Sequence, residues 1–84
     1  MTNEETLHAL IDGVNTLGLS TQDVHEAEVM LDYREYELAF DLVLHQLHAH
    51  HIRIKAEQLA LIQAAARRLH IPETNYEFVH QLLR

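Results

Sequence analysis

Apolar residues recur at steps of three and four along most of the chain, the spacing of helices with one buried face. The clearest case is the segment 33–48, whose apolar stripe comprises Tyr36, Ala39, Phe40, Val43, Leu44 and Leu47. Its other side carries Glu37, Asp41, His45 and His48, at steps of four, four and three. Such steps keep side chains in one row. We therefore predict a central helix with its stripe toward a core and its polar row toward solvent.

Local capping signals predict where the first helix begins and ends. Thr2 and Glu5 have the spacing of a capping box, in which each side chain bonds the other residue's backbone amide. Gly18 is placed for the left-handed residue that follows a helix. Helix-period apolar positions between them predict a helix over 3–17. These positions are Leu7, Leu10, Ile11, Val14 and Leu17.

A second set of start signals predicts a helix over 21–32. Ser20 is the expected N-cap with Asp23 at the third helical position, and Leu19 and Val24 form a hydrophobic staple pair. The inward positions of this helix are Val24, Ala27, Met30 and Leu31. The side chains expected to point away from the core are Asp23, Glu26 and Glu28.

The inward pattern slips between Leu31 and Leu38, because the next inward positions are occupied by Arg34 and Glu35. A break of one to three residues near Tyr33 would reset the phase. The alternative is one continuous helix over 21–50 with charged residues at inward positions near its middle. We favour the break, because helices of about 30 residues are uncommon in compact domains.

Residues 50–55 alternate around Ile52 and Ile54, which predicts a short extended connector, too short for a stable strand. A helix over 56–69 follows, with Leu59, Ile62, Ala66 and Leu69 inward. We expect Ile71–Pro72 to end it, because a residue before proline is pushed out of helical geometry. Pro72 then opens a last helix over 73–83. The inward residues of that helix are Tyr76, Val79, Leu82 and Leu83.

These elements predict an all-α fold, a compact bundle of four to five short helices. Its 84 residues suit a single domain, residues 1–84. The chain has no cysteine, which fits a reducing compartment and argues against a disulfide-held scaffold. No apolar run is long enough to span a membrane, and the first residues do not have the form of a signal peptide. We expect a cytoplasmic protein.

Charge is distributed unevenly along the chain. The formal net charge is −7, but residues 1–45 hold ten acids and one base, whereas residues 46–84 hold three acids and five bases. The first half would repel nucleic acid, since binding to phosphates requires local positive charge. It would attract a basic protein, although acids are also common on any soluble surface.

The residues offer little for catalysis or for a cofactor. The lone serine, Ser20, is already expected to cap a helix, and there is no glycine-rich phosphate loop. Asp41, His45 and His48 are chemically plausible metal ligands. No further cluster with metal-ligand spacing completes them, so solvated histidines are the ordinary explanation. We predict neither an enzyme nor a metal site, and chelation is expected to leave folding unchanged.

Two tyrosines flank the acids at the start of the central helix. Tyrosine is enriched among the residues that contribute most to protein interfaces, because its ring packs while its hydroxyl stays hydrated. We expect Tyr33 to lie on the surface and Tyr36 to be at least half-buried.

Between Leu17 and Leu83, about four fifths of the chain, the sequence resembles the MafI family of small immunity proteins. The matching features are Leu17-Gly18-Leu19-Ser20, Glu35-Tyr36-Glu37-Leu38-Ala39, Gln46-Leu47, Ile52 and Ile54, Leu61-Ile62, Ile71-Pro72-Glu73 and Tyr76-Glu77-Phe78. The chain departs from the family at His48, Ala49, His50 and Arg53, where an aromatic and acidic stretch and a proline are expected.

The resemblance implies a non-enzymatic cytoplasmic antidote, without cofactor, that binds one secreted bacterial toxin and blocks it. Such toxins are often nucleases with basic grooves, which an acidic face would occlude. The residues expected to contact the toxin are Glu28, Asp32, Tyr33, Glu37, Asp41, His45 and His48. Nucleic acid, membrane and small-molecule partners are not expected. The alternatives are a helical adaptor or self-associating module, and a histidine-based metal or pH-responsive binder.

Overall fold

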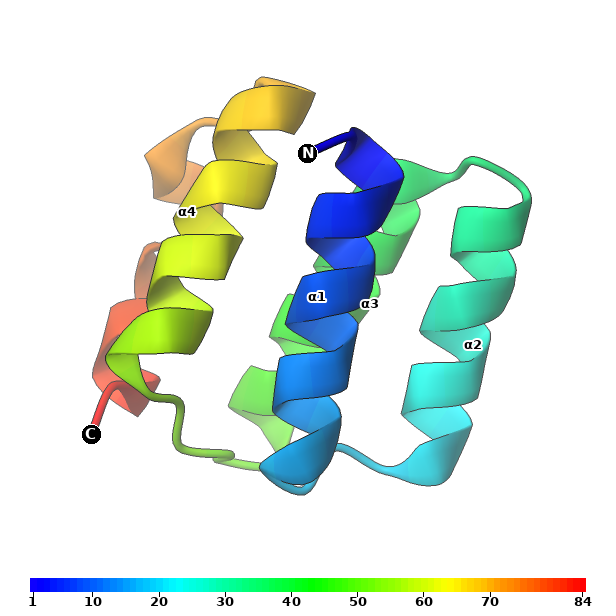
Figure 1. The fold of residues 1–84 in the computed structure, drawn as a ribbon. Coiled ribbons are helices and arrows are strands. Elements are labelled where there is room, and N and C mark those ends of the chain that lie inside the picture. Colours follow the sequence, from blue (N-terminus) through cyan, green and yellow to red (C-terminus); the bar gives the residue numbers. More distant parts are fainter.

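The computed structural model describes residues 1–84 and has an all-α fold, as predicted (Figure 1). Its four α-helices are α1 (Asn3–Thr16), α2 (Thr21–Asp32), α3 (Tyr36–Ala49) and α4 (Ala56–Leu69). Two 3₁₀ segments follow, η1 (Glu73–Asn75) and η2 (Glu77–Leu82). The only β-type pairing is an isolated parallel bridge between Ile54 and Leu83.

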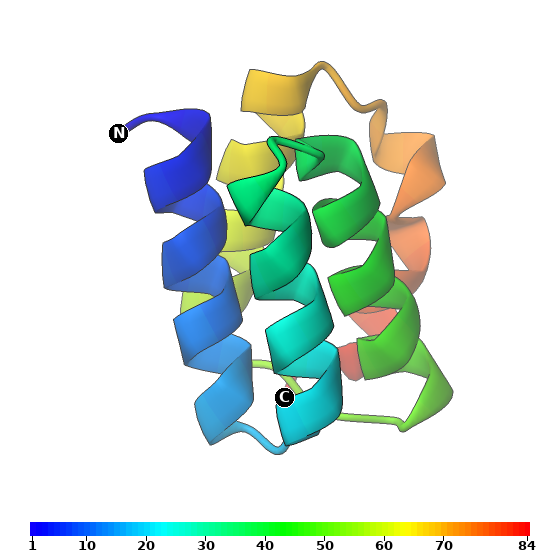
Figure 2. The same cartoon turned by 90° about the vertical axis from the view of Figure 1, so that its right-hand side faces the viewer.

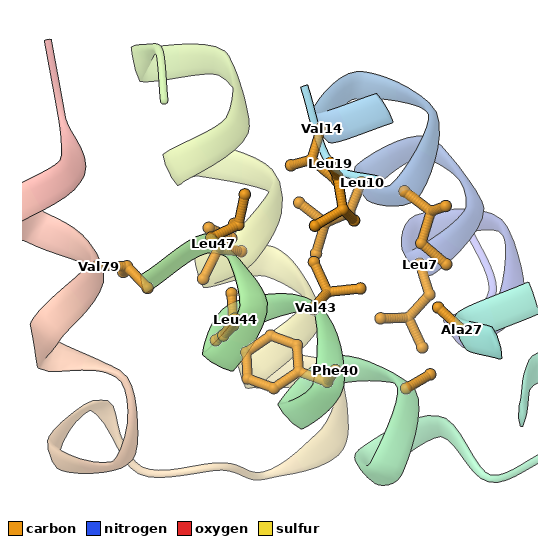
Figure 3. Close-up of a cluster of buried hydrophobic side chains, with 14 of the residues drawn as sticks. Leu7, Leu10, Val14, Leu19, Ala27, Phe40, Val43, Leu44, Leu47 and Val79 are labelled. Atoms are coloured by element: carbon orange, nitrogen blue, oxygen red, sulfur yellow. The ribbon is translucent and has the colours of Figure 1, made fainter. Parts of the chain in front are cut away.

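Helix α3 is the centre of the packing, because it contacts α1, α2, α4 and η2. Helix α1 lies between α4 and α2, with α3 behind it, and the view turned by 90° shows α2 and α3 side by side (Figures 1 and 2). In Figure 3, α3 lies between the apolar side chains of α1 and Val79 of η2. The predicted inward stripe of α3 is confirmed: five of its residues are buried and Tyr36 is half-buried.

Both predicted helix starts are confirmed by their hydrogen bonds. The Thr2 hydroxyl accepts from the Glu5 amide at 3.1 Å, while the Glu5 carboxylate accepts from the Thr2 amide at 2.8 Å. At α2, the Ser20 hydroxyl accepts from the Asp23 amide at 3.1 Å, and both staple residues are buried. These caps satisfy backbone donors that have no partner within the helix.

The Glu5 cap predicts a small acid-dependent loss of stability. The Thr2 backbone amide that donates to the carboxylate holds the pKa of Glu5 below its ordinary value of 4.5. A depressed folded-state pKa stabilises the fold above the unfolded pKa, and that contribution is lost as pH falls through the folded one. Urea unfolding of the wild type and Glu5→Gln should therefore show a stability difference at pH 7 that shrinks below pH 4.5. A difference that grew on acidification would contradict this origin.

All four α-helices end in the same motif, with a left-handed residue just past the helix. These residues are Gly18, Arg34, His51 and His70, with φ of 115°, 59°, 51° and 59°. In each case the next amide donates to a carbonyl five residues earlier, the signature of a Schellman motif. The donors are Leu19, Glu35, Ile52 and Ile71, and the acceptors are Val14, Met30, Leu47 and Ala66. Only the first of these endings was predicted.

The motif at Arg34 confirms the predicted break and rules out the continuous helix over 21–50. Helix α2 ends at Asp32 and the Glu35 amide bonds the Met30 carbonyl at 2.8 Å, so the chain turns back on itself. Helix α3 begins at Tyr36, three residues later than predicted. The bounds of α4 match the prediction, but it ends in the left-handed His70 before Ile71–Pro72 is reached.

Replacing His70 by glycine should stabilise the protein by about 0.5–1 kcal/mol. A left-handed conformation costs an L-residue about 1–2 kcal/mol, and the extra freedom of glycine in the unfolded chain offsets part of that gain. The matched reverse change is Gly18→Ala, since no atom lies within 4 Å of the added methyl group and only the backbone responds. Thermal unfolding should show opposite shifts for the two variants. Shifts of the same sign would mean that backbone strain does not decide the outcome.

The predicted α-helix over 73–83 is wrong, because the segment forms η1 and η2 instead. Its buried residues Tyr76, Val79 and Leu82 recur at steps of three, which matches the three residues per turn of a 3₁₀ helix. Leu83, expected as part of the helix, instead pairs with Ile54. The Ile54 amide donates to the Leu82 carbonyl at 2.8 Å, and this long-range pairing anchors the end of the chain. The predicted connector is confirmed, with Ile54 fully buried and Ile52 half-buried.

A candidate protein-binding face

A hydrogen bond between side chains joins the facing sides of α2 and α3. The Gln46 amide nitrogen of α3 donates to the Asp23 carboxylate of α2 at 3.2 Å. Asp23 was expected to point away from the core, but it is buried, with 8% of its surface exposed. The expectation failed because the first turn of α2 packs against the last turns of α3, where Gln46 supplies the polar partner that a buried carboxylate needs.

The first predicted acid pair lies on the edge of α2 that is remote from α3. Successive residues of a helix are rotated by about 100°, so Glu28 lies about 140° around α2 from Asp23, and Asp32 about 180°. Both are exposed. Glu28 and Asp32 therefore form an acidic edge on the far side of α2.

The second predicted acid pair lies on the opposite side of the two-helix layer. Glu37 is about 180° around α3 from Gln46, and Asp41 about 140°. They share the edge of α3 with His45 and His48, whose rings lie 5.8 and 5.0 Å from the ring of Phe78 in η2. All four are exposed. The structure thus has the four predicted contact residues of α3 along one edge and the acid pair of α2 on the opposite edge of the two-helix layer.

Exposed apolar side chains lie between these two acidic edges. Tyr33 is 75% exposed at the α2–α3 turn and Leu38 is 53% exposed in the first turn of α3. Val29, one turn before Tyr33 in α2, is 37% exposed. The half-buried Met30 and Leu42 continue this apolar surface toward the core. We call these five residues the outer α2–α3 face.

The expectations for the two tyrosines are both confirmed, with Tyr33 on the surface and Tyr36 half-buried. Sequence reasoning missed Val29 and Leu38 as surface residues. The exposure of Leu38 could have been predicted from its position, because it lies outside the buried stripe formed by Tyr36, Ala39 and Phe40. A leucine there has no place in the core of the same helix.

The histidines at the end of α3 pack with one another and with Phe78. His48 and His51 have ring centroids 6.4 Å apart, and the Nδ1 atom of His45 lies within hydrogen-bond distance of the Asp41 carbonyl oxygen, at 2.7 Å. No group of three or more histidine, cysteine or acidic side chains is arranged to hold a metal ion. The one serine hydroxyl is engaged as the cap of α2.

No protein-family model matches the chain, and no curated protein or solved structure shows significant similarity to it. None of its helices combines the length and apolar character that crossing a membrane requires.

Proposed function

We propose that this protein is an immunity protein that binds a basic bacterial toxin domain and blocks it. The observation that carries the proposal is that α1, α2 and α3 all carry exposed acids and no lysine or arginine, against a net positive second half of the chain. The resemblance to the MafI immunity family between Leu17 and Leu83 supports the same reading. An acidic surface attracts a basic partner and repels nucleic acid. Nucleic acid would otherwise bind to the same basic surface of the partner.

Inhibition in this proposal is steric and electrostatic, with no chemical step. The antidote meets lysine and arginine side chains of the toxin with its acidic edges and covers a basic groove. A nuclease is the toxin class that such an acidic surface suits best, because its groove is built to attract phosphates. Tyr33 acts as an anchor, since an exposed aromatic ring supplies contact area at a small entropic cost.

We expect a gene for a large secreted toxin directly upstream of this gene, and the test is coexpression of this chain with the toxin domain that the upstream gene encodes. We expect that domain to arrest a heterologous bacterial host, and coexpression of this chain to restore growth. An unrelated acidic helical protein serves as the control for charge alone. The purified pair should also associate directly. Arrest that persists despite soluble expression of this chain, together with no association in vitro, would refute the proposal.

A further inference from the structure

The outer α2–α3 face carries three exposed apolar side chains that are not packed against the hydrophobic core. Tyr33, Leu38 and Val29 make up all the exposed large hydrophobic residues of the protein except Met1. They lie on neighbouring parts of the α2–α3 hairpin: the Tyr33 amide bonds the Val29 carbonyl in the last turn of α2, and Leu38 lies in the first turn of α3. Apolar groups gathered in this way on an otherwise polar surface mark an interaction site.

The charges around this face select the kind of partner. Asp32 lies on its α2 edge, Asp41 on its α3 edge and Glu26 beside Val29, and all three are exposed. An apolar centre bordered by charged residues is the anatomy of a protein interface, in which the centre excludes water and the rim stays hydrated. Two separate acidic edges require positive charge on both sides of the part that docks.

We propose that the outer α2–α3 face is the docking site for a partner protein that presents an apolar surface between two groups of lysine or arginine side chains. This rests on the proposed function, in which that partner is the toxin. A second copy of this chain is disfavoured, because a two-fold contact would bring acidic edges against acidic edges. Tyr33 and Leu38 lie at the centre and control dissociation, while Asp32 and Asp41 lie at the rim and control encounter.

The test measures binding of the neighbouring toxin domain, in a catalytically inactivated form, to the double variant Tyr33→Ser/Leu38→Ser. We expect the dissociation constant to rise by at least about thirtyfold, mainly through faster dissociation. The matched control is Asn15→Ser/Ala60→Ser, at exposed positions of α1 and α4, which should bind within about twofold of the wild type. Circular dichroism melting should show that both variants remain folded.

The outcomes separate this inference from the proposed function. Wild-type binding that the central double variant retains in full overturns the docking site and leaves the immunity function standing. Failure of the wild type to bind overturns both. Sedimentation of the free wild type as a dimer, with the central double variant a monomer, would show that a second copy covers the face and overturn the docking proposal.

Discussion

Replacing Phe40 by alanine should destabilise the fold by about 3–5 kcal/mol, a large part of the 5–15 kcal/mol typical of a small domain. Phe40 is 1% exposed, and its ring meets that of Tyr76 edge-on, with centroids 6.0 Å apart at 87°. Its removal leaves a cavity where α3 and the C-terminal segment meet, and the packed surroundings relax only partly. Urea unfolding followed by circular dichroism measures the loss.

The matched control for this change is Phe78→Ala. Phe78 is half-buried and packs on the exposed rings of His45 and His48, so water reaches the space that its removal opens. We expect it to cost clearly less than Phe40→Ala. Equal losses for the two variants would show that the core does not close around Phe40.

The helix starts were predictable because each is decided within a few residues. Thr2 forms its capping hydrogen bond with Glu5, and Ser20 forms its own with the Asp23 amide, so both partners lie within three residues in the sequence. The buried stripe of α3 was predictable for a similar reason, since it depends on the helical period alone. In both cases no distant part of the chain competes with the local preference.

Helix ends and the C-terminal segment depend on more than the local pattern. Arg34, His51 and His70 adopt the left-handed conformation that glycine usually occupies. Only the ending at Gly18 could therefore be predicted from the residue type. A better signal was the hydrophobic residue after the left-handed position, which is Leu19, Ile52 or Ile71 in three of the four motifs. The C-terminal segment also pairs through Leu83 with Ile54, a residue far away in sequence, and no local pattern indicates that contact.

In the candidate site, too, features set by nearby residues were predictable and features set by distant residues were not. The exposure of Glu28, Asp32, Glu37 and Asp41 followed from helical spacing. Their separation onto two edges did not, because it depends on how α2 and α3 are rotated about their axes. That rotation is fixed by contacts such as the one between Asp23 and Gln46, which lie 23 residues apart.

Under the proposed function, reversing the charge of Glu37 and Asp41 should slow association with the toxin strongly while leaving the fold intact. Both are exposed, and surface substitutions usually change stability by no more than about 0.5 kcal/mol. Steering by surface charge raises association rates by about 10- to 1,000-fold, and this effect is screened beyond about 8 Å at physiological salt. We expect Glu37→Lys/Asp41→Lys to reduce the association rate at least about tenfold at low salt, with dissociation changed less.

The control for net charge is Asp12→Lys/Glu57→Lys, which makes the same total change at exposed positions of α1 and α4. Surface plasmon resonance at two salt concentrations should show a large, salt-sensitive loss for the α3 variant and a smaller one for the control. A similar loss for both would mean that overall charge, and not the α3 edge, steers the encounter. Wild-type kinetics for the α3 variant at low salt would remove the α3 edge from the interface. The surface around Arg67 and Arg68 in the last turn of α4 would then be the better candidate, because its positive charge requires an acidic partner.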